Sequence, residues 1–302
     1  MVQAWKFPRE WTVEELASSR AHSEELFRQE RKEEGPRAFE SVYREVEPRV
    51  REVLETTDDL RSLNGQIFIY DSSIWRALRY FCAPPVSEED LWTLVGQKFT
   101  TVPAALADDT ANVISEVLDP VRFPWVGEER PPTSPERESA VMATTALWSL
   151  ELLRTRRRGT ASKRQEAEVA AALEQIGYSL DAKRGDIDVL DVLERASYSR
   201  ERKVAGAKCD VPIRLKDGRL LAVECKVSNG PKNSWKRLIR ECGGKSETWR
   251  QKFGTQVLTI AVLAGSFDLS CLVNAQKTDG LWIFWQHDLS AMAEFVQSIE
   301  GS

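Results

Sequence analysis

The sequence predicts an α/β protein (α+β or α/β in class) with a helical N-terminal region followed by a part in which helices and strands alternate. Three observations support this fold class. Apolar residues recur at helical spacing through the first half, and apolar strand-like runs alternate with helical patterns after Gly159. The length of 302 residues also corresponds to about two average domains.

The composition is typical of a soluble globular protein. Hydrophobic residues make up 42% of the chain and charged residues 29%, which excludes a disordered or collagen-like chain. No apolar run approaches the roughly 18–20 residues of a membrane span. The start from Met1 to Lys6 lacks the apolar core of a signal peptide. We therefore expect a cytoplasmic protein without a membrane partner.

The first half is predicted to consist of helices. Residues 13–34 form one helix, which breaks at Gly35-Pro36, and residues 37–56 form the next. The sequence from Ser87 to Asp90 resembles a capping box and predicts another helix start. A helix over 135–156 ends in a run of arginines before Gly159. We place the boundary there, with a helical domain at 1–158 and a second domain at 159–302.

The second half alternates between the two kinds of element. Helices are predicted over 161–176, ending at Gly177-Tyr178, and over 233–251. Strands are predicted over four short runs, 209–215, 219–227, 256–263 and 280–285. Such alternation indicates an α/β domain.

The charge is unevenly distributed along the chain. Residues 1–158 carry a net charge of −7 and residues 159–302 a net charge of +2. Within the second half, residues 195–252 hold 16 basic and 6 acidic side chains, a net charge of +10. Such a concentration is typical of a surface that faces a polyanion, although a solvated basic surface is the alternative.

The cysteines and histidines of the sequence limit the kinds of metal or catalytic site that we expect. The five cysteines are widely spaced without any Cys-x-x-Cys, so neither a disulfide framework nor a zinc site is predicted. Only His22 and His287 are present, which makes nucleophilic catalysis assisted by histidine a poor hypothesis. Carboxylate, lysine or metal chemistry is favoured instead.

A predicted hairpin carries the candidate site. The run Lys216-Asp217-Gly218 separates two β-rich segments, and we expect a three-residue turn with Gly218 in the left-handed conformation. This register places Asp210 opposite Glu224, and Lys226 shares their face because side chains alternate along a strand.

Two carboxylates placed opposite each other repel, so we expect a cation between them. Mg²⁺ binds a few carboxylates together with waters and phosphate oxygens, and it activates an attacking water for hydrolysis of a phosphodiester. The sequence therefore predicts Mg²⁺ as cofactor, held by Asp210 and Glu224. Lys226 would orient the water or offset charge on the transition state.

These residues resemble the PD-(D/E)xK nuclease superfamily, whose core is a mixed sheet flanked by helices. The match comprises Asp210, Glu224 and Lys226, with Cys209 in place of the proline that often precedes the aspartate. The resemblance also implies a glutamate near the metal on the preceding helix. Glu166 matches it, eleven residues before Gly177, and is expected to act with Asp210 and Glu224 as a catalytic residue and metal ligand. The alternative is a first-turn carboxylate that favours the helix dipole.

More narrowly, the sequence is similar to the XamI family of type II restriction endonucleases over about 160–295. The resemblance is carried by the runs Glu224–Asn229, Asn233–Leu238, Ala261–Phe267 and Phe284–Leu289, and by Lys245, Trp249 and Phe253-Gly254. It implies Mg²⁺-dependent, sequence-specific cutting of double-stranded DNA that leaves 5′-phosphate and 3′-hydroxyl ends. A DNA methyltransferase that protects host sites is implied as genetic partner, and symmetric cutting favours a homodimer.

Two alternatives stay open at this stage. A DNA repair or structure-specific nuclease could use the same core without base-sequence specificity. A catalytically inactive DNA-binding module could retain the fold, although the intact Asp210, Glu224 and Lys226 oppose this interpretation.

The helix after the hairpin is predicted to contact DNA. An apolar stripe of Trp235, Leu238, Ile239 and Cys242 leaves three cations, Lys236, Arg237 and Arg240, on other faces, where they could reach phosphates. The polar residues Ser228, Asn229, Asn233 and Ser234 are candidates for DNA contact, or else ordinary turn and cap residues. Gly243-Gly244-Lys245-Ser246 lacks the first glycine of a phosphate-binding loop, and we expect a helix kink or break there.

Overall fold

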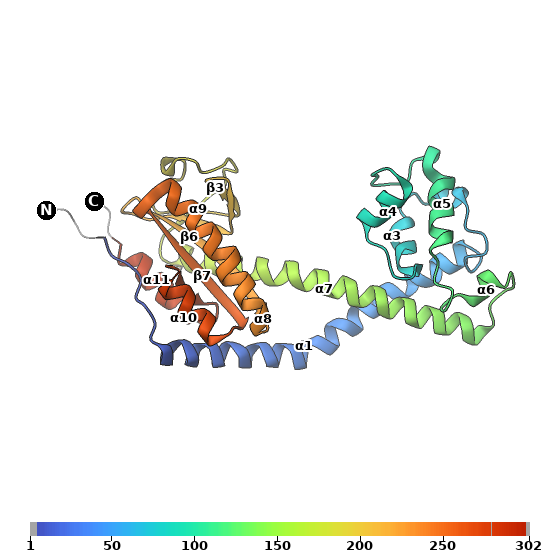
Figure 1. The fold of residues 1–302 in the computed structure, drawn as a ribbon, viewed down its shortest axis with the longest axis horizontal. Coiled ribbons are helices and arrows are strands. Elements are labelled where there is room, and N and C mark those ends of the chain that lie inside the picture. Colours follow the sequence, from blue (N-terminus) through green and yellow to red (C-terminus); the bar gives the residue numbers. More distant parts are fainter. Residues whose placement is uncertain (1–4, 279, 300–302) are drawn as a thin grey trace. The chain divides into compact units, whose positions relative to one another are not determined.

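The computed structural model describes residues 5–278 and 280–299 (Figure 1). The chain divides into two compact units. The helical unit is Glu34–Arg156, and the sheet unit combines the residues up to Glu33 with those from Arg157 onward. The predicted division into 1–158 and 159–302 differs from this one chiefly in the placement of residues 5–33, which belong to the sheet unit.

Two long helices connect the units through the chain. Helix α1 runs over Val13–Thr56 and α7 over Ser134–Gln175, both without interruption. The predicted breaks at Gly35-Pro36 and at Gly159 are therefore wrong. An interior glycine costs about 1 kcal/mol and an interior proline about 3 kcal/mol relative to alanine. Each helix is packed on both sides of its breaker, and this packing outweighs the local penalty.

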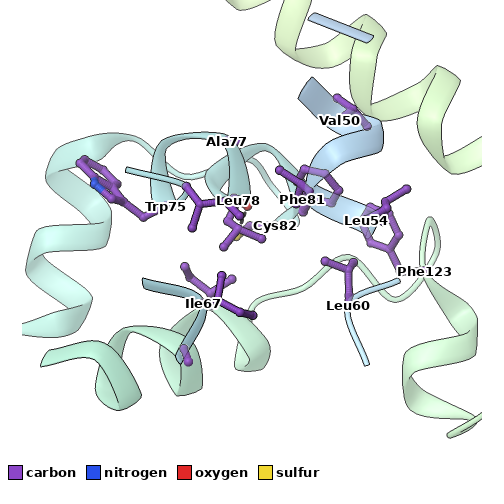
Figure 2. Close-up of a cluster of buried hydrophobic side chains, with 14 of the residues drawn as sticks. Val50, Leu54, Leu60, Ile67, Trp75, Ala77, Leu78, Phe81, Cys82 and Phe123 are labelled. Carbon is purple, nitrogen blue, oxygen red and sulfur yellow. Dashed lines mark hydrogen bonds between the residues drawn. The ribbon is translucent and has the colours of Figure 1, made fainter. Parts of the chain in front are cut away.

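The helical unit has its own apolar core. Between α1 and α7 the chain forms short helices with the following bounds: α2 Gly65–Tyr70, α3 Trp75–Leu78, a 3₁₀ turn Arg79–Phe81, α4 Glu88–Val95, a 3₁₀ turn Ala104–Leu106, α5 Ala107–Glu116 and α6 Pro124–Gly127. Ser87 and Asp90 form the predicted capping box at the start of α4. Figure 2 shows Leu54, Trp75 and Phe81 within this core, all of them fully buried.

A six-stranded mixed sheet is the centre of the other unit. Its strand order is β1-β2-β5-β6-β7-β8. The bounds are β1 Ser179–Asp181, β2 Ser197–Ser199, β5 Val211–Arg214, β6 Leu220–Asn229, β7 Val257–Ser266 and β8 Trp282–Trp285. Strand β5 is antiparallel to β2 and β6, and the other neighbours are parallel. The predicted mixed sheet with a helical N-terminal region is confirmed.

Helices cover both faces of the sheet. On one face, Leu221, Val223 and Cys225 of β6 pack in one cluster with Val169 and Leu173 of α7, together with residues of α11 (Ser290–Gln297). On the other face lie α10 (Leu269–Lys277) and a helical segment made of α8 (Pro231–Ser234), a π-helical stretch (Trp235–Gly243) and α9 (Gly244–Phe253) (Figure 1). This segment is the crossover between β6 and β7, as the sequence predicted for 233–251.

The residues just before α1 and the first part of α1 are tied to the sheet by specific contacts. The Trp11 indole N–H donates to the Ile283 carbonyl at 2.6 Å. The Ser23 hydroxyl accepts from the Gly265 amide and donates to the Gly265 carbonyl, both at 2.9 Å. Gly265 has φ +89, and a Cβ there would lie 2.2 Å from the Ser228 carbonyl oxygen, so this close approach requires glycine.

A small two-stranded ribbon leads into the candidate site. Strands β3 (Arg202–Val204) and β4 (Ala207–Cys209) pair antiparallel, and β4 ends one residue before Asp210. Another short 3₁₀ turn, Leu190–Val192, precedes β2, and a second, Gly254–Gln256, precedes β7. Among the residues that the structure describes, no helix combines the length and the apolar character needed to cross a bilayer.

Candidate active site

The hairpin of β5 and β6 has the predicted register. The pairs Val211 with Val223 and Ile213 with Leu221 extend by one step to Asp210 opposite Glu224. The turn closes through the Gly218 amide, which donates to the Leu215 carbonyl at 3.0 Å, and Gly218 has φ +90. A three-residue turn therefore determines which side chains face each other.

Lys226 lies between the two carboxylates. Its Nζ is 3.0 Å from Asp210 Oδ2 and 2.7 Å from Glu224 Oε2. The Cys225 amide also donates to Asp210 Oδ2, at 2.8 Å. The structure thus brings the three predicted residues together, with the Lys226 ammonium as the cation that joins the carboxylates.

Glu224 is buried completely. Burial raises the pKa of its carboxyl above the ordinary value, and the neighbouring charges of Lys226 and Lys245 oppose that rise. For Lys226, burial alone would lower the pKa, but Glu224 and Asp210 raise it above the usual range for lysine. Lys226 therefore carries its charge throughout the physiological pH range.

Lys245 is a fourth member of the site, to which the sequence assigned no role in catalysis or binding. Its Nζ donates to both oxygens of Glu224, at 2.9 Å from Oε1 and 2.7 Å from Oε2. Helical backbone continues through Gly243 and Gly244, so of the kink or break expected there, the break is absent. The spacing in the sequence could have indicated this position. Lys245 stands three residues after Cys242 and four before Trp249, and the structure buries both of these side chains fully. Lys245 therefore lies on the side of the helix that faces the sheet.

The donor set fits a small hard cation. Two carboxylates share one face of the hairpin and already have ammonium groups as their counterions. Within residues 5–278 and 280–299, no three Asp, Glu, His or Cys side chains lie together as a ready-made metal cluster. Mg²⁺ requires only one or two carboxylates, because water and substrate oxygens complete its shell, so Asp210 and Glu224 suffice.

Glu166 lies near this group but contacts another residue. Its carboxylate accepts from the Ser162 hydroxyl at 2.8 Å. Burial raises the pKa of Glu166, the hydrogen bond from Ser162 opposes the rise, and the Asp210 charge adds to it. Because α7 begins at Ser134, Glu166 is not in a first helical turn, and the helix-dipole explanation is wrong.

The four polar candidates at the end of β6 fall into two kinds. Ser228 and Ser234 are buried and bond to backbone: Ser228 donates to the Gly230 carbonyl at 3.0 Å, and Ser234 accepts from the Asp268 amide at 3.2 Å. These contacts are those of turn residues, the alternative that the sequence left open. Asn229 and Asn233 are exposed, and Asn229 accepts from Arg31 at 3.2 Å.

The three predicted phosphate contacts lie away from the buried side of the helix. Lys236 and Arg240 are exposed and Arg237 is half-buried, as the apolar stripe predicted. Trp235 departs from that stripe with 43% exposure. The reason is the π-helical backbone, which has more residues per turn than an α-helix and rotates Trp235 away from the sheet.

The two histidines lie near each other. Their ring centroids are 4.6 Å apart in an edge-to-face arrangement. Burial lowers the pKa of His287, and the charge of His22 lowers it further. All five cysteines are buried, each outside any disulfide.

Comparison with known proteins identifies the family. The family model described as XamI restriction endonuclease matches residues 58–285. A relative from Xanthomonas campestris pv. amaranthicola, the type II restriction enzyme XamI, is 31% identical over 264 residues, which cover 82% of this chain and 93% of the relative. No solved structure matches the chain. The chain therefore belongs to the XamI restriction endonuclease family, whose members are type II site-specific deoxyribonucleases.

Proposed function

We propose that this protein cuts double-stranded DNA at a specific sequence in a Mg²⁺-dependent reaction that leaves 5′-phosphate and 3′-hydroxyl ends. The observation that carries the proposal is the convergence of Asp210, Glu224 and Lys226 on one face of the β5–β6 hairpin. Family membership supports DNA as the substrate, and the site supplies the groups that phosphodiester hydrolysis needs.

We further propose that the sheet unit is a PD-(D/E)xK nuclease core. Its hairpin, the helical crossover and the parallel strand β7 follow in the order that this superfamily uses. The meeting of Asp210, Glu224 and Lys226 on this hairpin supports the assignment. The preceding helix α7 supplies Glu166 on the side of Asp210, whose charge acts on it.

Each residue has a separate role in this mechanism. Asp210 and Glu224 would hold the metal ion, which when bound would supply polarisation of the scissile phosphodiester and a lowered pKa of an attacking water. Lys226 keeps its ammonium beside both carboxylates, where it orients the water and offsets charge on the pentacovalent transition state. The water attacks phosphorus in line and gives a proton to solvent, so that a new P–O bond forms on the 5′-phosphate. The P–O3′ bond breaks, and the 3′-oxygen takes a proton from solvent and leaves as the hydroxyl.

We propose two partners in addition to DNA. A double-strand cut at a symmetric site calls for two active sites related by a two-fold axis, which a homodimer provides. A methyltransferase that modifies the same sequence would protect the host DNA. Our candidates for DNA contact are the exposed Lys236, Arg240, Asn229 and Asn233 and the half-buried Arg237.

Alanine substitutions at the site test the proposal. We expect Asp210→Ala, Glu224→Ala and Lys226→Ala each to abolish detectable cleavage of phage DNA with Mg²⁺, because each loses several kcal/mol of transition-state stabilisation and about 1.4 kcal/mol is tenfold in rate. Lys216→Ala, in the exposed turn of the same hairpin, is the matched control.

The same assay separates the proposal from its alternatives. End mapping of the wild-type products should give one sequence at every cut. Cuts that follow DNA structure and ignore sequence would indicate a repair nuclease, and binding without any cut would indicate an inactive module. Near-normal cutting by any of the three variants would contradict the site assignment.

A further inference from the structure

We propose that Lys245 is an additional catalytic residue, which holds Glu224 in the metal-free enzyme and contacts the scissile phosphate when Glu224 holds the metal ion. This inference rests on the proposed function of the same site. It concerns a residue that lies outside the Asp210, Glu224 and Lys226 motif and comes from a different element, helix α9.

Lys245 binds both carboxylate oxygens of Glu224. One ammonium donates to both carboxylate oxygens, at 2.9 and 2.7 Å, and Lys226 pairs with Oε2 from the other side at 2.7 Å. Hydrogen bonds between charged groups are stronger than neutral ones, especially away from water. A cation that binds Glu224 must therefore compete with the Lys245 ammonium for the same oxygens.

The second observation is the charge balance of the site. The carboxylates of Asp210 and Glu224 are paired with the two amino groups of Lys226 and Lys245, so the ionised forms of these four side chains balance in charge. A divalent cation adds two positive charges in a buried place. Two ammonium groups beside it then require new anionic partners, and the phosphates of the bound DNA are the anions that the reaction brings.

The two lysines differ in how freely their side chains can move. The Lys226 side chain is 11% exposed and extends from the middle of a strand, with both carboxylates as neighbours. The Lys245 side chain is 25% exposed and has Glu224 as its ion-pair partner. Lys245 is thus the ammonium that can reach the substrate side with the smaller rearrangement.

The position of Lys245 is held by its helix. Trp249, four residues later on the same side, is fully buried, and its indole N–H donates to the Val204 carbonyl at 2.9 Å. Cys242, three residues earlier, is also fully buried. These two anchors keep the base of the Lys245 side chain beside Glu224 while the flexible stem lets its ammonium move.

The test combines metal binding with cleavage for Lys245→Met. Titration calorimetry of the DNA-free protein with Ca²⁺ should show about tenfold tighter binding than in the wild type, because the competing ammonium is gone. Single-turnover cleavage with saturating Mg²⁺ should fall about 100-fold, the effect typical of removing one donor to a developing charge. Lys245→Arg should recover part of the cleavage.

Two controls make the result specific. Lys252→Met removes an exposed lysine from the same helix and should change neither quantity. Lys245→Gln keeps a polar side chain of similar length and serves in place of Lys245→Met if that variant fails to fold, as judged by thermal unfolding.

Each outcome decides the inference. Weaker Ca²⁺ binding together with lost cleavage would mean that Lys245 only supports Glu224, and unchanged Ca²⁺ affinity or unchanged cleavage would overturn the proposal. Cleavage by Glu224→Gln, measured alongside, distinguishes a failure of the Lys245 role from a failure of the proposed active site. If Glu224→Gln is inactive and Lys245→Met is normal, the role of Lys245 alone fails. If Glu224→Gln cuts normally, the proposed active site fails.

Discussion

A fully buried carboxylate such as Glu224 is stable in ionised form only when cations surround it. Moving a charge out of water costs several kcal/mol even after relaxation, and the cost is offset only by close partners of good geometry. Glu224 has two such partners, Lys226 and Lys245, within 3 Å of its oxygens. These two ammonium groups therefore favour the ionised form of Glu224, the form that could hold a metal ion, against the effect of burial.

The contribution of Glu166 to cleavage can be tested with a single substitution. Glu166→Gln should slow single-turnover cleavage by roughly tenfold, less than the loss of a direct ligand, because Glu166 bonds to Ser162 and acts on the site only through its charge. If Glu166→Gln matches the wild type at every Mg²⁺ concentration, its role is confined to the helix.

The pH dependence of stability gives this variant a second measurement. Burial raises the pKa of Glu166 in the folded protein, so ionisation costs more in the folded than in the unfolded state. As pH rises from the ordinary carboxyl pKa of 4.5 to the raised value, the wild type should lose stability relative to Glu166→Gln, and above that value the difference should stay constant. Urea unfolding of both proteins at several pH values measures this difference in stability.

At the scale of elements, the crossover helix contributes to the site and offers a surface to DNA. Its buried side includes Leu238, Cys242 and Trp249, and its exposed side includes Lys236 and Arg240. The π-helical stretch from Trp235 to Gly243 changes the register between these sides. Such stretches are frequent at functional sites, because an added residue turns one side chain to a new face.

Substituting Lys236, Arg237 and Arg240 together by Gln tests the exposed side. We expect weaker binding to all DNA sequences. The log–log slope of affinity against salt concentration should become shallower by roughly 0.9 for each phosphate that the variant no longer neutralises. Preference among sequences should persist. Binding is measured by fluorescence anisotropy with Ca²⁺ at several salt concentrations, with Lys277→Gln as a control on α10.

Two other results would contradict this assignment. If the triple variant keeps its affinity for random DNA and loses discrimination between target and mismatched sites, these side chains read bases. If neither quantity changes, this side of the helix faces solvent in the complex. The net charge of +10 over residues 195–252 would then require another explanation.

At the scale of the whole molecule, the chain passes between its two units inside α1 and α7. The boundaries at Glu33/Glu34 and Arg156/Arg157 both fall within continuous helices. Each unit has its own apolar core, and the core of the helical unit draws its buried residues from Val42 to Leu153. Separate cores indicate that each unit folds around its own apolar contacts.

A fragment covering 34–156 should fold by itself. Its core includes the fully buried Leu54, Trp75 and Phe81 and needs no residue of the sheet unit. We expect a helical circular dichroism spectrum with one cooperative thermal transition and no nuclease activity. Leu78→Ala in the fragment should lower its stability by about 2–5 kcal/mol, the usual cost of emptying a buried leucine site. A fragment without a cooperative transition would show that the core depends on the rest of the chain.

The sequence by itself determined the hairpin and the three side chains that meet on it. The reason is locality: Gly218 sets a three-residue turn, the turn sets the register, and the alternation of strand side chains places Asp210, Glu224 and Lys226 on one face. Only short-range rules are needed for this result.

Only the tertiary structure decided the features that depend on packing between distant segments. Gly35-Pro36 and Gly159 are sound local signals for helix ends, yet packing on both sides keeps α1 and α7 continuous. Lys245 meets Glu224 because the crossover helix lies against the sheet in one register, which a π-helical stretch shifts. Such contacts join residues far apart in the chain, and their summed free energy exceeds the local penalties of about 1–3 kcal/mol that sequence patterns report.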